Sequence, residues 1–515
     1  MKIFFTSMAS ARWMRSKSSP PTGLPFVSVP SLTANFAVVR QAWVESGARN
    51  AAIASGPPKS CSTLAEPDWQ PSVAVSSNAQ RSVFMDEMYG MFERLAIRLP
   101  CGGGLISLGP MKLFLALSIA ALSVSAAQWS EFRGPNGAGK TEADLPLEFG
   151  EGKNVKWKTS MPGKAWSSPV VWGDQIWFTN AEADGKKLWA VCLNAKTGKV
   201  LHNKLIFEIE KPQHSPVAMN SYASCTPAIE EGRVYVSYGV HGTACLDTKT
   251  AEVIWQRQDE ELRVDHFRLP ASSPILYGDL LVMIFDGADK QFVVALNKKD
   301  GKTKWLHKRA FDYRTNNPDR KKAYGTPTFF NIGGQAQLIA PAAVATEALD
   351  PASGKLLWTS RTGGMNVSGR PLYGHGLIFI NNGMGSLSAV KPGKGEVNPV
   401  WNTRRNIAKK SSMILHGDHL YMVADNGVAT CVAAKSGEVV WSERLGAGEF
   451  AASPIFCKGR IYCFSMTGNG VVFAASPEFK RLSQGKFADG FMASPAVTGK
   501  ALILRTKSAV YRVEN

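Results

Sequence analysis

Cysteine is scarce in this sequence, and the motifs that would give it a chemical role are missing. The six cysteines after residue 127 form no Cys-x-x-Cys pair, no haem-attachment motif and no vicinal pair, so we expect no metal site. We interpret them as small core residues, and export allows a disulfide between them without demanding one. No lipobox precedes any of them, so we expect no lipid anchor. The sequence also has no Gly-x-Ser-x-Gly elbow and no His-Glu-x-x-His motif, and these absences exclude two common hydrolase designs.

Acidic residues are few relative to basic ones. The chain has 59 Lys and Arg against 41 Asp and Glu, a formal net charge of +18. The basic residues are scattered, with small clusters at 320–322 and 404–410. Such a surface favours anionic partners. We do not expect nucleic acid to be among them, because no aromatic-rich binding module accompanies the charge.

No apolar run in the N-terminal region is long enough to cross a bilayer comfortably. Met111-Lys112 precedes a short apolar run over 113–121, and small residues end the segment at Ala126-Ala127. This pattern predicts a signal peptide at 111–127 and an exported protein, periplasmic or extracellular, without a transmembrane segment. Residues 1–110 lack periodicity and are rich in Ser, Ala and Pro, so we interpret them as a disordered extension or a wrongly assigned upstream start.

A short pattern recurs eight times from Ser168 onward. Each unit begins at a step that is usually Ser/Thr-Pro and continues with apolar runs separated by glycine-containing turns. The apolar residues alternate, as at Val234, Val236 and Tyr238, which predicts strands. A spacing of roughly 41 to 58 residues is typical of propeller blades. The openings are Ser168-Pro169, Thr226-Pro227, Ser273-Pro274, Thr326-Pro327, Arg370-Pro371, Ser412-Met413, Ser453-Pro454 and Ser494-Pro495.

The unit endings carry the most specific signal. They combine an Asx, Ser/Thr and Gly turn with a following tryptophan, and an indole there can bury a large area between neighbouring blades. This ending resembles the tryptophan-docking repeat of the quinoprotein-like (pyrroloquinoline-quinone repeat) β-propeller family, over about three quarters of the chain. We interpret five tryptophans as structural: Trp255, Trp305, Trp358, Trp401 and Trp441.

The fold predicted is an all-β, eight-bladed β-propeller over residues 154–515, preceded by a loop segment at 128–153. The last unit has too few strands for a complete blade, and residues 154–159 look like a unit ending without a beginning. An N-terminal strand closing the last blade would complete the ring and remove its sheet edges. We expect a monomer.

A phosphate-loop pattern occurs at Gly134–Thr141. Its chemistry needs a buried strand before the loop and a helix after it. The preceding segment is polar, and Pro146 and Gly150 interrupt any following helix. We therefore expect a glycine-rich loop that crosses one face of the propeller.

The family resemblance implies a possible active site on the propeller axis. Quinoprotein enzymes bind pyrroloquinoline quinone and calcium there and use an aspartate as base. We can match no complete ligand set, the vicinal disulfide of many members is absent, and Asp286-Gly287 is equally an ordinary turn. The catalytic candidates are Asp286, His266 and Asp265. The cofactor-binding candidates are Asn220, His241, Arg268, Asn382 and Asp425.

The favoured hypothesis is an exported, non-catalytic scaffold without a cofactor or metal. It is similar in architecture to the propeller subunit of the outer-membrane β-barrel assembly machinery, and would bind a protein or an anionic cell-envelope polymer. The alternative is a pyrroloquinoline-quinone-dependent dehydrogenase of alcohols or sugars, which would also need calcium.

Overall fold

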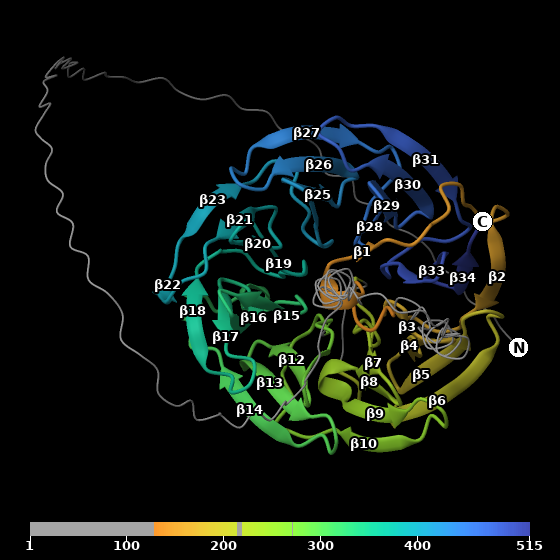
Figure 1. Ribbon diagram of the computed structural model, residues 1–515. Coiled ribbons are helices and arrows are strands. Elements are labelled where there is room, and N and C mark those ends of the chain that lie inside the picture. The colour runs from red at the N-terminus through yellow and green to blue at the C-terminus, as the bar shows by residue number, and fades with distance from the viewer. Residues whose placement is uncertain (1–127, 214–218, 270) are drawn as a thin grey trace, which may run out of the picture. The chain divides into compact units, whose positions relative to one another are not determined.

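Eight β-sheets form a ring around a central axis in the computed structural model, which describes residues 128–213, 219–269 and 271–515 (Figure 1). The predictions for residues 1–110 and 111–127 lie outside these ranges. The described residues contain no helix that is long and apolar enough to cross a membrane. The all-β, eight-bladed propeller predicted from the repeat is confirmed.

The blades follow one another in chain order, and each begins with its innermost strand. The first four blades are β3 (Val170–Trp172), β4 (Gln175–Ala181), β5 (Lys187–Asn194) and β6 (Val200–Glu208); β7 (Ala228–Glu230), β8 (Arg233–Ser237), β9 (Thr243–Asp247) and β10 (Val253–Arg257); β11 (Ile275–Tyr277), β12 (Leu280–Asp286), β13 (Gln291–Asn297) and β14 (Thr303–Lys308); β15 (Thr328–Ile332), β16 (Gln335–Pro341), β17 (Thr346–Leu349) and β18 (Leu356–Ser360).

The last four blades continue the same order, except that the outermost strand of the eighth comes from near the start of the described chain. They are β19 (Leu372–Gly374), β20 (Leu377–Asn381), β21 (Leu387–Val390) and β23 (Pro399–Thr403); β24 (Ile414–His416), β25 (His419–Val423), β26 (Val428–Ala433) and β27 (Val439–Arg444); β28 (Ile455–Cys457), β29 (Arg460–Phe464), β30 (Asn469–Ala474) and β31 (Arg481–Lys486); β32 (Ala496–Thr498), β33 (Ala501–Arg505), β34 (Ala509–Val513) and β2 (Val155–Ser160).

Two blades carry a fifth, two-residue strand. β1 (Lys140–Thr141) runs parallel to β28, and β22 (Gly395–Glu396) runs parallel to β18. Three single turns of 3-10 helix complete the described secondary structure: η1 (Pro135–Gly137), η2 (Gly239–His241) and η3 (Pro318–Lys321).

The middle strands are apolar on both faces because each blade is packed between two others. On β12, Leu281 and Met283 enter the core shared with the preceding blade, whereas Val282 and Ile284 enter the core shared with the following blade. All four side chains are at most 4% exposed. This two-sided packing accounts for the nearly continuous apolar runs of the sequence.

The ring is closed by β2, which pairs antiparallel with β34. Trp157 lies opposite Arg512, and Thr159 lies opposite Val510. Strands from the two ends of the described chain therefore share one sheet, as the sequence predicts. The pairing supplies the eighth blade with its outermost strand.

Most of the tryptophans that close a unit dock onto the turn of the next blade. The indole Nε1 of Trp255 donates a hydrogen bond to the Lys298 carbonyl at 2.8 Å, and its ring lies where a Cβ on Gly301 would clash. Trp305, Trp401 and Trp441 make equivalent bonds to the next blade. The structural role predicted for these residues is confirmed.

Trp358 departs from this pattern. Its Nε1 donates to Gln337 Oε1 of its own blade at 2.8 Å, and β22 pairs alongside it, with Gly395 opposite Trp358. The indole is only 1% exposed. The segment before β23, which would have supplied a docking turn, therefore serves as an added strand that covers the tryptophan.

Replacing Trp157 with alanine should lower the free energy of unfolding by about 2 kcal/mol, because a large, partly buried aromatic ring is lost from the closing strand. Its Nε1 donates to the Ala195 carbonyl at 3.1 Å, and its ring packs on Gly198 of the first blade. Urea unfolding measures the change. Val440→Ala, at an outer-strand residue that is 41% exposed, should change it by less than about 0.5 kcal/mol. Equal effects of the two substitutions would contradict the docking role.

Candidate functional site

A cavity of about 360 Å³ lies on the propeller axis. The first residues of six blades line it, which places it inside the ring of innermost strands. Loops between strands supply further lining, including Trp166, Asn220, Tyr324, Lys409 and Asp425. The lining residues that stand at the openings of the six blades are Ser168, Thr226, Ser273, Thr326, Ser453 and Ser494.

A belt of hydrogen bonds joins these openings. The backbone N–H of Ser168 donates to Thr226 Oγ1 of the next blade at 3.0 Å, and the belt closes where Ser494 N donates to Ser168 Oγ at 2.9 Å. A hydroxyl before the innermost strand of a blade therefore holds the neighbouring blade, which explains the recurring Ser or Thr. The other links are Thr226 to Ser273, Ser273 to Thr326, Arg370 to Ser412, Ser412 to Ser453 and Ser453 to Ser494.

Arg370 interrupts the belt in the fifth blade, because its side chain has no acceptor for the Thr326 N–H. Its guanidinium instead donates to Thr328 Oγ1 at 2.8 Å and to the Phe132 carbonyl at 2.6 Å. It also pairs with Glu131 at 3.2 Å. The residue that breaks the repeat thus anchors the segment before the propeller to the axis.

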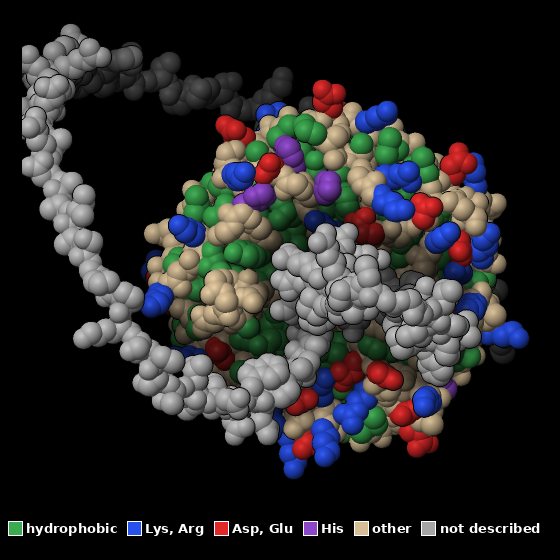
Figure 2. Space-filling view, in the orientation of Figure 1, with side chains coloured by type: hydrophobic (Ala, Val, Ile, Leu, Met, Phe, Trp, Pro, Cys, Tyr) green, Lys and Arg blue, Asp and Glu red, His purple; other side chains and the backbone are tan. Residues whose placement is uncertain are grey.

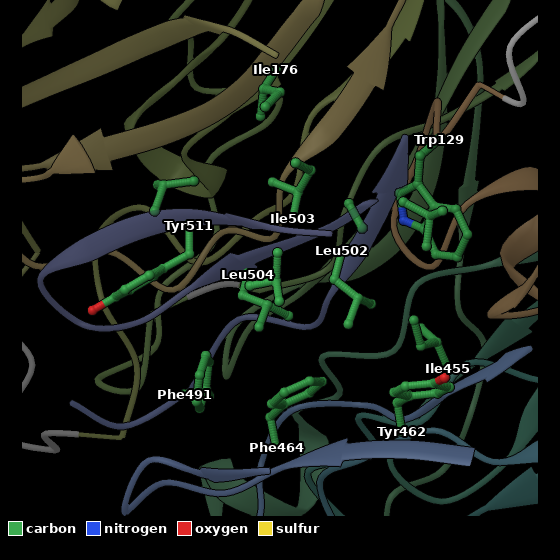
Figure 3. Close-up of a cluster of buried hydrophobic side chains, with 14 of the residues drawn as sticks. Trp129, Ile176, Ile455, Tyr462, Phe464, Phe491, Leu502, Ile503, Leu504 and Tyr511 are labelled. Carbon is green, nitrogen blue, oxygen red and sulfur yellow. The ribbon is translucent and has the colours of Figure 1, made fainter. Parts of the chain in front are cut away.

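That N-terminal segment contributes to the core as well as to the axis. Trp129 bridges to Val171 and is 2% exposed, and Figure 3 shows it in the cluster with Ile455 and Leu502. Figure 1 shows the orange chain that follows it at the centre of the ring. The segment expected to be a loop therefore includes a buried tryptophan and the strand β1.

The phosphate-loop pattern is a packing motif in this structure. Gly134, Gly137 and Gly139 all have positive φ. A Cβ on Gly137 would lie 2.1 Å from the Arg370 guanidinium, so glycine is required there for close packing. The segment forms η1 and then β1, with no α-helix after the loop to receive phosphate.

Charged groups at the cavity are mostly paired. Arg268 donates two hydrogen bonds to Asp319, and Lys410 lies 3.1 Å from Asp425. Asp425 also accepts the backbone N–H groups of Lys409 and Lys410. Among the described residues, the ammonium of Lys409 has no ion pair. The lining is therefore net positive, although basic and acidic side chains alternate around the rim of the face in Figure 2.

The structure brings three of the eight candidate residues to the cavity. Asn220, Arg268 and Asp425 line it, and Asn220 Nδ2 donates to the Arg268 carbonyl at 2.9 Å. Asp265 accepts a hydrogen bond from Gln213 at 2.7 Å, outside the lining. Asn382 also lies outside it, where its side chain accepts two backbone N–H groups of its own turn.

Asp286 lies in a buried ion-pair cluster between the third and fourth blades. Arg309 binds Asp286 at 3.0 Å and Glu347 at 2.9 Å, and the Lys322 ammonium donates to the Asp286 carbonyl at 2.6 Å. Burial raises the pKa of Asp286 to about 6, although Arg309 and Lys322 oppose the shift. Arg309 directly follows β14 of the same blade, so the Asp286 carboxylate is held within the third blade, outside the described cavity lining.

His241 and His266 are both buried outside the lining, at 4% and 3% exposure. His241 Nε2 accepts the Gln213 N–H at 3.1 Å, and His266 Nδ1 accepts the Arg268 N–H at 3.1 Å. Burial is the main cause that lowers the pKa of each imidazole to about 4. Both rings are therefore neutral near pH 7.

Acidification should destabilise the protein through His241. Because its pKa falls from 6.5 in the unfolded chain to about 4 in the folded state, the unfolded state binds more protons between these values, and stability is lost as pH falls. Through His241 alone, the free energy of unfolding should fall by roughly 2 kcal/mol between pH 7 and pH 4.5. Urea unfolding at pH 7 and 4.5 should show a smaller loss for His241→Gln than for the wild type. Equal losses would contradict this assignment.

The described residues do not fit a calcium–quinone site. Within the described ranges, no three His, Cys, Asp or Glu side chains come together in a group that could hold a metal ion. Asp425 is the only carboxylate in the described cavity lining, and Lys410 and two N–H groups already engage it. Calcium takes six to eight oxygen ligands, with carboxylates prominent among them.

Tryptophan-docked blades around an axial cavity define an eight-bladed propeller of the quinoprotein-like repeat class. The chain belongs to the family described as outer membrane protein assembly factor BamB, whose family model matches residues 152–346, 228–443 and 346–515. A curated relative, outer membrane protein assembly factor BamB of Shewanella oneidensis, is 22% identical over 240 residues, which cover 43% of this chain. The match spans 57% of that relative's length.

Solved structures share the fold. The crystal structure of BamB from Moraxella catarrhalis matches with a TM-score of 0.50 and 11% identity, over 70% of this chain and 99% of that one. A europium-containing methanol dehydrogenase matches with a TM-score of 0.57 and 12% identity, over 74% and 90% of the two chains. The quinohemoprotein alcohol dehydrogenase of Comamonas testosteroni matches with a TM-score of 0.54 and 12% identity, over 77% of this chain and 81% of that one. At these identities the likeness concerns the fold alone.

Proposed function

We propose that this protein is an exported scaffold of the cell envelope that binds a protein partner in outer-membrane protein assembly and carries out no catalysis itself. Membership of the BamB family supports this function. The proposal that the protein does not catalyse a reaction rests on the position of Asp286, the best candidate for a catalytic base. Arg309 holds Asp286 in a buried ion pair outside the described lining of the axial cavity.

The ring is well suited to such a role. Hydrogen bonds between blade openings and docked tryptophans hold the blades rigidly, so loops and outer strands are presented in fixed positions. A protein partner is favoured over a polymer because the family match concerns an assembly factor. A dehydrogenase is the alternative, and it rests on likeness of fold alone.

Capture of the tagged full chain from its own envelope, after cross-linking in the cell, tests the proposal. Outer-membrane assembly proteins should be enriched over a capture with an unrelated exported protein carrying the same tag. Cells that lack the chain should contain less folded outer-membrane β-barrel protein. Enrichment of polysaccharide without any protein, or no enrichment together with unchanged barrel levels, would contradict it.

A further inference from the structure

The hydroxyl groups of the belt leave their hydrogens without acceptors. Six of them line the axial cavity, and each accepts a backbone N–H from a neighbouring blade through its oxygen. Among the described residues, none of these hydroxyls donates a hydrogen bond in return. The residues are 2–4% exposed. The six belt hydroxyls therefore form a ring of buried O–H donors around the cavity. Their hydrogens need acceptors from whatever occupies the cavity.

Two more buried groups of the lining lack partners. Trp166 Nε1 is a donor and Asn366 Oδ1 is an acceptor, and neither has a hydrogen-bond partner among the described residues. The occupant of the cavity must therefore offer many acceptors and at least one donor. A molecule with several hydroxyl groups meets both requirements, because each hydroxyl can accept and donate.

The charge, the aromatic surface and the volume of the cavity indicate further what kind of molecule can occupy it. Lys409 adds a cation without an ion pair in the described structure, and Arg268 lies in the same lining. Trp166, Tyr324 and Phe132 supply aromatic surface. A cavity of about 360 Å³ lies in the range of small-molecule sites.

We propose that the axial cavity binds a small acidic sugar, either free or as the end of a polysaccharide chain. Its carboxylate meets Lys409, its hydroxyls meet the belt, Trp166 Nε1 and Asn366 Oδ1, and its ring lies against the aromatic side chains. This inference does not rest on the protein partner proposed above, because it is argued from the lining of the cavity alone.

Calorimetric titration of the full chain tests the proposal with three probes: galacturonate, the galacturonate trimer and neutral galactose. Galacturonate should bind with a dissociation constant in the millimolar range or below, and more tightly than galactose. A trimer that binds about tenfold more tightly than the monomer assigns the site to a chain end, whereas equal affinities assign it to the free sugar. No heat of binding with either acid at millimolar concentration, which is the result for a cavity filled with water only, would overturn the proposal.

Two variants that spare the belt separate binding from folding. Trp166→Phe removes an N–H that has no partner among the described residues, and should weaken binding of both sugars roughly three- to tenfold. Lys409→Ala should weaken the binding of galacturonate about fivefold and leave the binding of galactose unchanged. Lys500→Ala, in the exposed turn between β32 and β33 and outside the lining, is the matched control. Binding of the acid that is insensitive to both cavity variants would place the sugar elsewhere and overturn the assignment.

Discussion

Replacing Arg133 with methionine is expected to lower the free energy of unfolding by about 4 kcal/mol. The side chain is 1% exposed and donates to the carbonyls of Gly137 and Ala138 in its own segment, and of Met413 and Pro454 in two further blades. Methionine fills part of the volume but leaves these buried oxygens without donors. Each unsatisfied group costs about 1–3 kcal/mol before relaxation.

Chemical denaturation at neutral pH measures this loss. Burial, with Arg370 nearby, lowers the pKa of Arg133 to about 9, so the wild-type side chain is charged at pH 7. Arg133→Lys keeps a charge but loses the planar fork, and should give an intermediate loss. Arg263→Met is the control, because that side chain is 66% exposed, and it should cost less than about 0.5 kcal/mol. A loss below about 1 kcal/mol for Arg133→Met would contradict the anchoring role.

Replacing Arg309 with methionine should cost about 3–5 kcal/mol, because Asp286 and Glu347 would remain buried without their cation. Arg309 and Asp286 side chains are fully buried, and Glu347 is 2% exposed. Arg309 also donates to the carbonyls of Ala340 and Pro341. The cluster joins the third blade to the fourth, so the lost stability should come from weaker packing between these two blades.

A triple variant tests the origin of this loss. Adding Asp286→Asn and Glu347→Gln to Arg309→Met removes both orphaned charges and should recover more than half of the lost stability. Arg314→Met, at a side chain that is 77% exposed, should change stability by less than about 0.5 kcal/mol. If the triple variant is no more stable than Arg309→Met, the cost does not come from unpaired buried carboxylates.

The blades could be predicted from the sequence because their signals are local and recur. Proline at a strand opening, glycine in a turn and tryptophan at a unit ending each reflect a nearby packing need, and eight repeats reinforce one interpretation. Ring closure followed from the same regularity, since the last unit lacked a strand that residues 154–159 could supply. The structure pairs that segment with β34.

The candidate site was harder to predict because its parts come from different blades. Every belt residue was visible as a unit opening, but the bond from one opening to the next depends on the position of the neighbouring blade. The pairing of Asp286 with Arg309 lies within the third blade, but it joins residues 23 positions apart, with β13 and β14 between them. Arg370 was a missed signal: it replaces Ser or Thr in one opening of the repeat, and it anchors the N-terminal segment.

Reconstitution with pyrroloquinoline quinone and calcium tests the central claim, that this propeller binds and does not catalyse, most directly. The full chain is incubated with both, freed of excess by gel filtration and examined for quinone absorbance, thermal stability and dye-linked oxidation of alcohols and sugars. We expect no retained absorbance, an unchanged melting temperature and no oxidation. A stoichiometric quinone signal with a raised melting temperature and substrate oxidation would contradict the account.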